Sequence, residues 1–224
     1  MSAPSDNPDS TRAPLPESQP GIILRHLPRI EVMESETLLS GWSRVIRVFY
    51  RLFRRDGSVQ TQDRDLLNRG DGVTVLLFNR ERQTVLLLRQ PRISAVLRGH
   101  PTGETIEVCN GQVEDGESPF DCAMREVEQE TGHRLAHLIP LGDFYASPGA
   151  SLEIVHLFAG EFGPSTLVGE SGGLYHEGED IETFEIPFAE AMQWIDRKII
   201  VDARSTLALQ LVFIRRIASD QAIA

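Results

Sequence analysis

The chain has 224 residues, with 22 Lys and Arg against 33 Asp and Glu, and a formal net charge of -11 at pH 7. This acidic balance excludes a general nucleic-acid or membrane-surface binder, because no basic excess is available to neutralise a phosphate backbone. Two cysteines exclude a disulfide scaffold and no apolar run is long enough to span a bilayer, so we expect a cytoplasmic protein without nucleic-acid or membrane partners.

The N-terminal third is predicted to be a tail followed by an extension. Residues 1–20 are rich in Pro, Ser and Asp and predict a disordered tail, while residues 21–33 show no clear period and stay unassigned. Residues 42–53 and 59–65 predict a β-hairpin, because Asp56 and Gly57 between them are a strong turn signal. We therefore divide the chain into a tail (1–20), an extension carrying the hairpin (21–70) and a main domain (71–224).

The main domain is predicted to begin with two buried strands, residues 73–78 and 85–88, joined by a short polar turn. Arg89 and Arg92 follow the second strand. Arginines can hold phosphate oxygens through two hydrogen bonds, so this pair is a candidate phosphate clamp. The alternative is that both are solvated loop residues. Residues 95–103 predict a loop, and residues 104–109 alternate as a strand.

The next segment predicts a short helix with clear ends. Ser118 suits the N-cap, Pro119 the first helical position, Asp121 the third residue of an acidic capping box, and Gly132 the stop. Four apolar residues recur at helical spacing and predict a stripe facing the core: Phe120, Ala123, Met124 and Val127.

Glu126 and Glu130 lie four residues apart, on a different side of this helix. Two carboxylates in that arrangement repel each other, and a cation between them would reverse the sign. Mg²⁺ is the natural candidate, because it takes hard oxygen ligands and is usually held by one or two carboxylates together with substrate phosphates. The alternative is a solvated acidic face.

The remaining chain predicts an alternation of strands and helices. Residues 137–145, 152–162 and 181–187 read as strands, and residues 189–197 and 205–218 as helices. The loop between residues 163 and 180 is long for a compact domain, which is typical of functional or disordered segments. It ends in an acidic cluster that either is solvated surface or carries a base: Glu177, Glu179, Asp180 and Glu182.

The segment from Gly111 to His133 resembles the Nudix hydrolase signature. The matching positions are Gly111, Glu117, Arg125, Glu126, Glu130 and Gly132. Two positions depart from the signature: Gln129 replaces the first residue of the Glu-Glu pair, and His133 replaces the final aliphatic residue. Gln129 brings no charge and cannot act as a base, which leaves the number of metal ions open.

The resemblance implies an α/β fold in which a mixed β-sheet is sandwiched between helices, and a reaction in which water attacks a phosphorus of a nucleoside diphosphate derivative. Segments outside the signature are similar to the branch that cleaves ADP-ribose and GDP-mannose, so the implied activity is a nucleoside diphosphate sugar pyrophosphatase. The implied cofactor is Mg²⁺, with Mn²⁺ as the alternative. Within the signature, the resemblance gives Glu117 a supporting role and Arg125 the role of fixing the loop. The implied metal ligands are Glu126, Glu130, Glu179 and the backbone carbonyl of Asn110.

Further roles follow from the same resemblance. Glu179 is implied as the general base, with Glu177 and Glu182 as competitors. The implied substrate contacts are Arg89, Arg92, Glu107, Glu153 and Arg204 of the main domain, together with Trp42 and Arg64 of the extension. Related members form homodimers through their N-terminal hairpins, so Trp42 and Arg64 are expected to reach the ligand across the subunit interface.

Two alternative functions remain open from the sequence. The first is a Nudix hydrolase of another substrate, such as a dinucleoside polyphosphate. The second is a non-catalytic module that binds ADP-ribose-like ligands as a sensor. The presence of both Glu126 and Glu130 favours an enzyme over the sensor.

Overall fold

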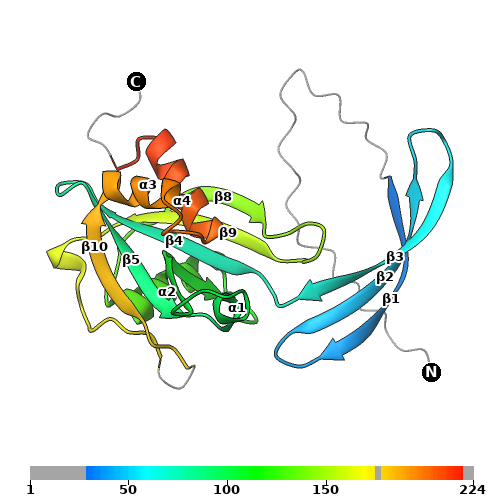
Figure 1. Cartoon of the computed structure of the whole chain (residues 1–224), viewed down its shortest axis with the longest axis horizontal. Coiled ribbons are helices and arrows are strands. Elements are labelled where there is room, and N and C mark those ends of the chain that lie inside the picture. Colours follow the sequence, from blue (N-terminus) through cyan, green and yellow to red (C-terminus); the bar gives the residue numbers. More distant parts are fainter. Residues whose placement is uncertain (1–28, 175–177, 219–224) are drawn as a thin grey trace.

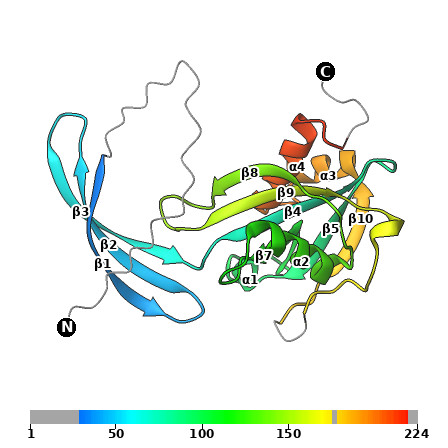
Figure 2. The same cartoon turned by 180° about the vertical axis from the view of Figure 1, so that it is seen from behind.

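The computed structural model describes residues 29–174 and 178–218. The tail expected over residues 1–20 and the competitor base Glu177 therefore lie outside the described residues. The described chain contains two sheets, a three-stranded N-terminal sheet and a seven-stranded central sheet. Figures 1 and 2 show the N-terminal sheet projecting to one side of the central sheet and its helices.

The N-terminal sheet is antiparallel, in the order β1-β2-β3. Its strands are β1 (Ile30–Ser40), β2 (Arg44–Phe53) and β3 (Val59–Asn68). β2 and β3 form the hairpin predicted from the sequence, and Gly57 at its turn has φ 86°, a conformation that glycine adopts at little cost. β1 covers part of the segment that the sequence left unassigned, so the extension is a hairpin enlarged by one edge strand.

The central sheet is mixed, as expected. Its main path runs β10-β5-β4-β9-β8, and the short strands β6 and β7 pair with β5 and β4. β4 is parallel to β9, and the other pairs are antiparallel. The strands are β4 (Gly72–Asn79), β5 (Thr84–Pro91), β6 (Glu104–Glu107), β7 (Cys109–Gln112), β8 (Ile139–Tyr145), β9 (Ile154–Glu161) and β10 (Glu182–Pro187).

Helices cover both faces of this sheet (Figure 1). α2 (Pro119–Thr131) packs on one face, and α3 (Phe188–Asp196) and α4 (Ala203–Ile214) pack on the other. Alternating residues of the central strands serve the two cores: Val85 and Leu87 of β5 face α3 and α4, whereas Leu86 and Leu88 face α2. This is the sandwich expected from the sequence.

The structure differs from the sequence expectations in four short segments. The loop expected over residues 95–103 begins with a five-residue helix, α1 (Ile93–Leu97), and the acidic loop contains a 3₁₀ turn, Pro164–Thr166. The strand expected over residues 104–109 is divided into β6 and β7 at Val108, whose backbone N–H donates to the Ser205 hydroxyl (2.9 Å) instead of to a neighbouring strand. α4 begins earlier than expected because Asp202 caps it, accepting from the Ser205 N–H (2.7 Å).

The N-terminal sheet is joined to the central sheet by backbone hydrogen bonds. The Leu67 N–H donates to the Ala150 carbonyl, and the Leu152 N–H donates to the Leu67 carbonyl, both at 2.9 Å. Leu67 and Ser151 thereby form an isolated parallel bridge. These bonds fix the end of β3 against the turn between β8 and β9.

Candidate active site

Helix α2 begins and ends as its sequence predicts. The Ser118 hydroxyl accepts a hydrogen bond from the Asp121 N–H (3.1 Å), and Pro119 occupies the first helical position. Gly132 ends the helix in the left-handed conformation, with φ 71°. Its N–H donates to the Glu128 carbonyl (3.0 Å). Local sequence therefore fixes both ends of α2.

Glu126 and Glu130 both face the sheet and are buried, so they are not a solvated surface pair. Glu130 is 1 % exposed, and its Oε2 accepts from the Asn110 N–H of β7 (3.0 Å). Burial raises the pKa of Glu130 to about 8, and the negative charges of Glu126 and Glu179 add to the rise. Three carboxylates therefore act on one another at the end of α2, where a cation would relieve their repulsion.

Gly111 allows Glu126 to lie against β7. A methyl group built on Gly111 would overlap the Glu126 Cγ, Cδ and Oε1 atoms. Only a residue without a side chain leaves room for that carboxylate between the helix and the strand. The signature glycine is thus explained by its packing against the Glu126 carboxylate.

Arg125 holds the acidic side of α2 in place. Its guanidinium forms two hydrogen bonds to Glu117 (both 2.9 Å) and one each to Glu126 (2.8 Å) and Gln129 (3.0 Å). The Arg125 hydrogen bond is the largest cause that lowers the pKa of Glu117 to about 2. Gln129, where the signature has an acid, is a neutral acceptor for Arg125 here.

A second ion pair lies at the edge formed by β5 and β6. Arg92 donates two hydrogen bonds to the buried Glu107 (2.9 and 2.8 Å), and the Thr105 hydroxyl donates a third (2.5 Å). Burial raises the pKa of Glu107, but the hydrogen bonds and the charges of Arg92 and Arg204 outweigh it, so the pKa lies below its usual value. The negative charge of Glu130 also raises the pKa of Arg92, which links this pair to α2.

A third ion pair joins Glu153, the residue before β9, to α4. Arg204 donates to the buried Glu153 (2.6 Å), and both side chains pass close to Gly72 at the start of β4. A methyl group on Gly72 would come within 3.1 Å of Glu153 Oε1 and 3.2 Å of the Gly111 carbonyl oxygen. Glu153, Arg204 and the signature glycine therefore meet at one point of the sheet.

Glu179 reaches the end of α2 from the acidic loop. Its Oε2 accepts from the Leu174 N–H (2.8 Å), and Gly173 provides the space beside it. The preceding part of the loop docks on the helix, since the Gly172 N–H donates to the Glu130 carbonyl (3.2 Å). Of the competitors, Glu182 instead pairs with Arg89 (2.9 Å).

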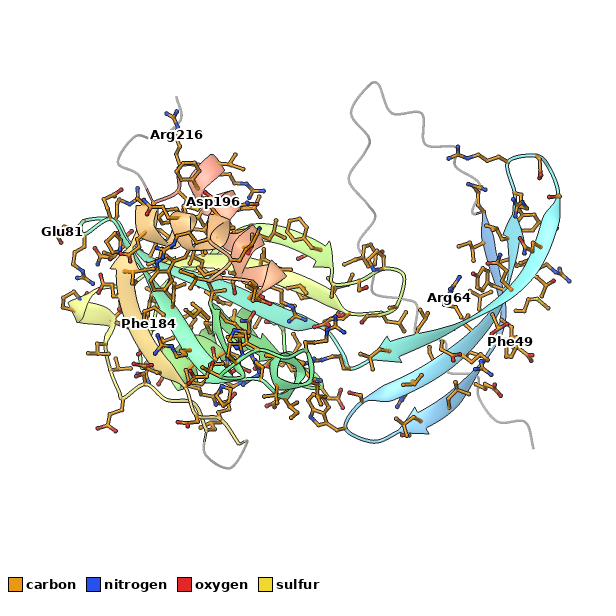
Figure 3. The ribbon with its side chains drawn as sticks, viewed as in Figure 1. Phe49, Arg64, Glu81, Phe184, Asp196 and Arg216 are labelled. Atoms are coloured by element: carbon orange, nitrogen blue, oxygen red, sulfur yellow. The ribbon has the colours of Figure 1, made fainter. Side chains whose placement is uncertain are left out.

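Three candidate substrate contacts remain, namely Arg89, Trp42 and Arg64. Arg89 packs over Phe184 (5.4 Å from guanidinium carbon to ring centroid), on the face of α3 and α4, so it does not join Arg92 on the α2 face. Trp42 is 83 % exposed, with Arg69 over its ring (5.3 Å). Figure 3 shows the exposed Arg64 on the N-terminal sheet.

Two residues near the acids were missed by sequence reasoning. The buried Thr74 hydroxyl of β4 donates to the Asn110 side-chain oxygen (2.6 Å), which fixes the residue whose carbonyl is the expected metal ligand. The buried Cys109 thiol hydrogen-bonds to Glu130, and burial raises the thiol pKa well above its usual value. The only indication of Thr74 in the sequence was that it is a polar residue within an otherwise apolar strand.

The donor set fits a hard cation in its chemistry, because Mg²⁺ prefers oxygen ligands and the buried carboxylates of Glu126 and Glu130 lie beside Asn110 of β7. Within residues 29–174 and 178–218, however, the side chains form no group of three or more His, Cys, Asp or Glu arranged to hold a metal ion. In the described residues, the expected ligands Glu126, Glu130 and Glu179 are therefore not arranged as one preformed metal site.

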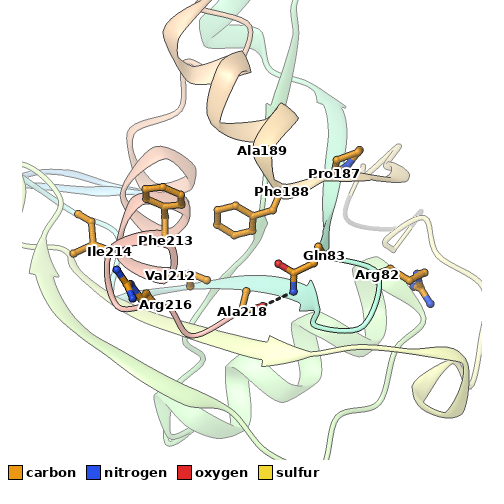
Figure 4. Close-up of a pocket in the computed structure, with 10 residues that line it drawn as sticks. All are labelled: Arg82, Gln83, Pro187, Phe188, Ala189, Val212, Phe213, Ile214, Arg216 and Ala218. Atoms are coloured by element: carbon orange, nitrogen blue, oxygen red, sulfur yellow. Dashed lines mark hydrogen bonds between the residues drawn. The ribbon is translucent and has the colours of Figure 1, made fainter. Parts of the chain in front are cut away.

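A separate cavity of about 740 Å³ opens at the opposite end of the strands (Figure 4). Phe188 and Phe213 stack on its wall, with ring centroids 6.2 Å apart. None of the carboxylates described above lines it. Its lining residues are Arg82, Gln83, Pro187, Phe188, Ala189, Val212, Phe213, Ile214, Arg216 and Ala218.

No helix in the described part of the chain is long and apolar enough to cross a membrane.

Comparisons with known proteins agree on one family. The model of the NUDIX domain matches residues 68–204. A GDP-mannose pyrophosphatase of Cronobacter sakazakii is 36 % identical over 188 residues, covering 84 % of this chain and 97 % of the relative. One from Pectobacterium atrosepticum is 37 % identical over 186 residues, covering 83 % and 95 %. The crystal structure of an ADP compounds hydrolase has a TM-score of 0.64 at 20 % identity, covering 85 % of this chain and 96 % of that one, and shares the fold.

Proposed function

The chain belongs to the NUDIX family of hydrolases, and we propose that it cleaves the pyrophosphate bond of a nucleoside diphosphate sugar in the presence of Mg²⁺. Water would attack one phosphorus, the bridging P–O bond would break, and the products would be a nucleoside monophosphate and a sugar phosphate. GDP-mannose is the leading substrate, since both relatives described above carry that name, and ADP-ribose is the second.

The observation that carries this proposal is the burial of Glu126 and Glu130 together, on the side of α2 that meets β7. Two adjacent buried carboxylates are costly in free energy unless they have a function or a cation. We assign them as ligands of Mg²⁺ (or Mn²⁺), together with the Asn110 carbonyl and Glu179. The bound ion would supply Lewis-acid polarisation and neutralise charge on the diphosphate.

The other residues of the cluster would position the reaction. Arg125 holds Glu126 and Glu117 in fixed orientations, which reduces the reorganisation needed when the ion binds. Glu179 is our choice for the base that takes a proton from the attacking water, because it is an acid near Glu130 that comes from a separate loop.

Substrate recognition would use two sets of side chains. Arg92, Glu107, Glu153 and Arg204 surround the acids and would contact the phosphates and the sugar. Arg89, on the other face of β5, would have to leave Phe184 and Glu182 to reach a phosphate. Trp42 and Arg64 would contact the base from the N-terminal sheet of the other subunit in a homodimer. An exposed indole suits this role, since an aromatic ring supplies contact area with little loss of conformational freedom.

A reducing compartment such as the cytoplasm agrees with the two cysteines, which are buried and free.

The proposal is tested with purified protein, Mg²⁺ and a panel of GDP-mannose, ADP-ribose and a dinucleoside polyphosphate, with products separated by chromatography. We expect turnover of at least one nucleoside diphosphate sugar, and a fall of about a hundredfold or more in Glu126→Gln. Glu128→Gln is the matched control: it removes the same charge from the same helix, at a residue paired with Arg134. Binding of ADP-ribose without turnover of any substrate would favour the sensor.

A further inference from the structure

Gln90 is a buried side chain with an unpaired hydrogen-bond donor. It is 5 % exposed, and its Nε2 atom has no acceptor among the residues that the structure describes. A buried N–H without an acceptor destabilises a protein, so such groups are uncommon and call for an explanation. Sequence reasoning gave Gln90 no role.

Strand alternation places Gln90 on the side of the sheet that carries the candidate active site. Residues 88, 90 and 92 share one face, and Leu88 belongs to the core formed with α2. Arg92, the next residue on that face, pairs with Glu107 and is influenced by the charge of Glu130. Gln90 therefore lies along the strand between the α2 core and the Arg92–Glu107 pair.

The neighbouring strand confirms which groups surround Gln90. In the pairing of β5 with β6, Gln90 is opposite Thr105 and Leu88 is opposite Glu107. The Thr105 hydroxyl donates to Glu107, and its oxygen accepts no hydrogen bond from the Gln90 amide. The nearby Glu107 oxygens already accept from Arg92 and Thr105, and the Gln90 amide is left out of this network.

An anionic oxygen would satisfy this donor, and the proposed chemistry supplies one. We propose that the Gln90 amide donates to a non-bridging oxygen of the substrate diphosphate, which makes Gln90 a substrate-binding residue. The inference rests on the proposed function, because that function brings an anionic oxygen to this face of the sheet. The Gln90 donor would gain a hydrogen-bond partner only when the substrate binds, so this bond stabilises the complex and not the free protein. Hydrogen bonds to charged oxygens are stronger than those to neutral acceptors.

This arrangement predicts opposite effects of one substitution on stability and on binding. Gln90→Met keeps the length of the side chain and removes the unpaired donor. We expect Tm of the ligand-free protein to rise by about 2 °C or more. We expect KM for the nucleoside diphosphate sugar, and Kd for methylenebisphosphonate measured calorimetrically with Mg²⁺, to rise about tenfold or more.

Two further variants complete the experiment. Gln90→Glu keeps the shape but replaces the donor with a carboxylate that repels phosphate, so its Kd should rise more than that of Gln90→Met. Gln193→Met, on the exposed side of α3, is the matched control and should change neither Tm nor Kd.

The outcomes separate this inference from the proposed function. If the unchanged protein hydrolyses the sugar nucleotide and Gln90→Met leaves KM and Kd unaltered, the inference is wrong and the function stands. If the unchanged protein shows no turnover but binds methylenebisphosphonate more tightly than Gln90→Met, the inference stands and the function fails. Failure of the unchanged protein both to hydrolyse and to bind would overturn both.

Discussion

At the scale of single residues, Gly111 and Glu126 depend on each other. The carboxylate of Glu126 occupies the space that a Gly111 side chain would need. We expect Gly111→Ala to displace Glu126 from β7, to lower turnover to near that of Glu126→Gln, and to cost about 1–3 kcal/mol of unfolding free energy. Gly149→Ala is the control, since its added methyl group would meet no atom within 4 Å. Full activity in Gly111→Ala would contradict the role given to this contact.

The ion pair of Arg125 and Glu117 predicts a pH dependence of stability. Because the pKa of Glu117 is lowered to about 2 by Arg125, the pair contributes its full stability above the ordinary glutamate pKa. That contribution is lost as the pH falls from about 4.5 toward 2. Urea unfolding midpoints measured between pH 2.5 and 6 should therefore decline less steeply with acid in Glu117→Gln than in the unchanged protein. Parallel curves would show that the pair is unimportant.

The site residues differ in how far the sequence could predict their positions. Glu126 and Glu130 were predicted to share one side of α2 because helical spacing is a local property of the chain. Arg89 and Arg92 were expected to act together. However, β5 continues through Arg89, and two side chains that lie three residues apart on a strand point to opposite faces of the sheet. The unpaired donor of Gln90 had no local signal, because burial depends on neighbouring strands.

At the scale of elements, α2 was predictable and β1 was not. Ser118, Pro119 and Gly132 mark the ends of α2 by local chemistry that needs no tertiary contact. β1 carries Glu31, Glu34 and Glu36 among its apolar residues and has two register irregularities against β2. An exposed edge strand is stabilised by its partner strand, and that pairing cannot be read from its own sequence.

The C-terminal end of α2 connects the helix to the loop that carries Glu179. Gly132 has a positive φ, and a methyl group there would overlap the Gly169 carbonyl. Gly132→Ala should cost more than the roughly 1–2 kcal/mol of a left-handed alanine, and should also lower turnover by moving the loop. Gly116→Ala is the matched control in chemical denaturation, because Gly116 has a similar φ of 81° with open space around it. Equal losses in the two variants would argue against loop packing.

At the scale of the whole molecule, the N-terminal sheet leaves apolar side chains uncovered. β1 is exposed along its length, and Figure 2 shows that the sheet stands apart from the helices that cover the central sheet. Isolated small sheets are marginally stable in water unless a hydrophobic face is packed against something. The exposed large apolar residues of this sheet include Ile30, Val32, Met33, Leu38, Leu39, Phe53 and Val59.

A homodimer that buries these residues is the remaining prediction, and it links assembly to activity. Leu39→Glu places a charge among the exposed apolar residues of β1, and we expect it to shift the sedimentation coefficient from dimer toward monomer. Because Trp42 and Arg64 are proposed to serve the other subunit, KM should rise about tenfold or more while the fold of the central sheet is retained. Thr61→Glu adds the same charge at an exposed polar position of β3 and should remain dimeric. A fully active monomer would disprove the shared site.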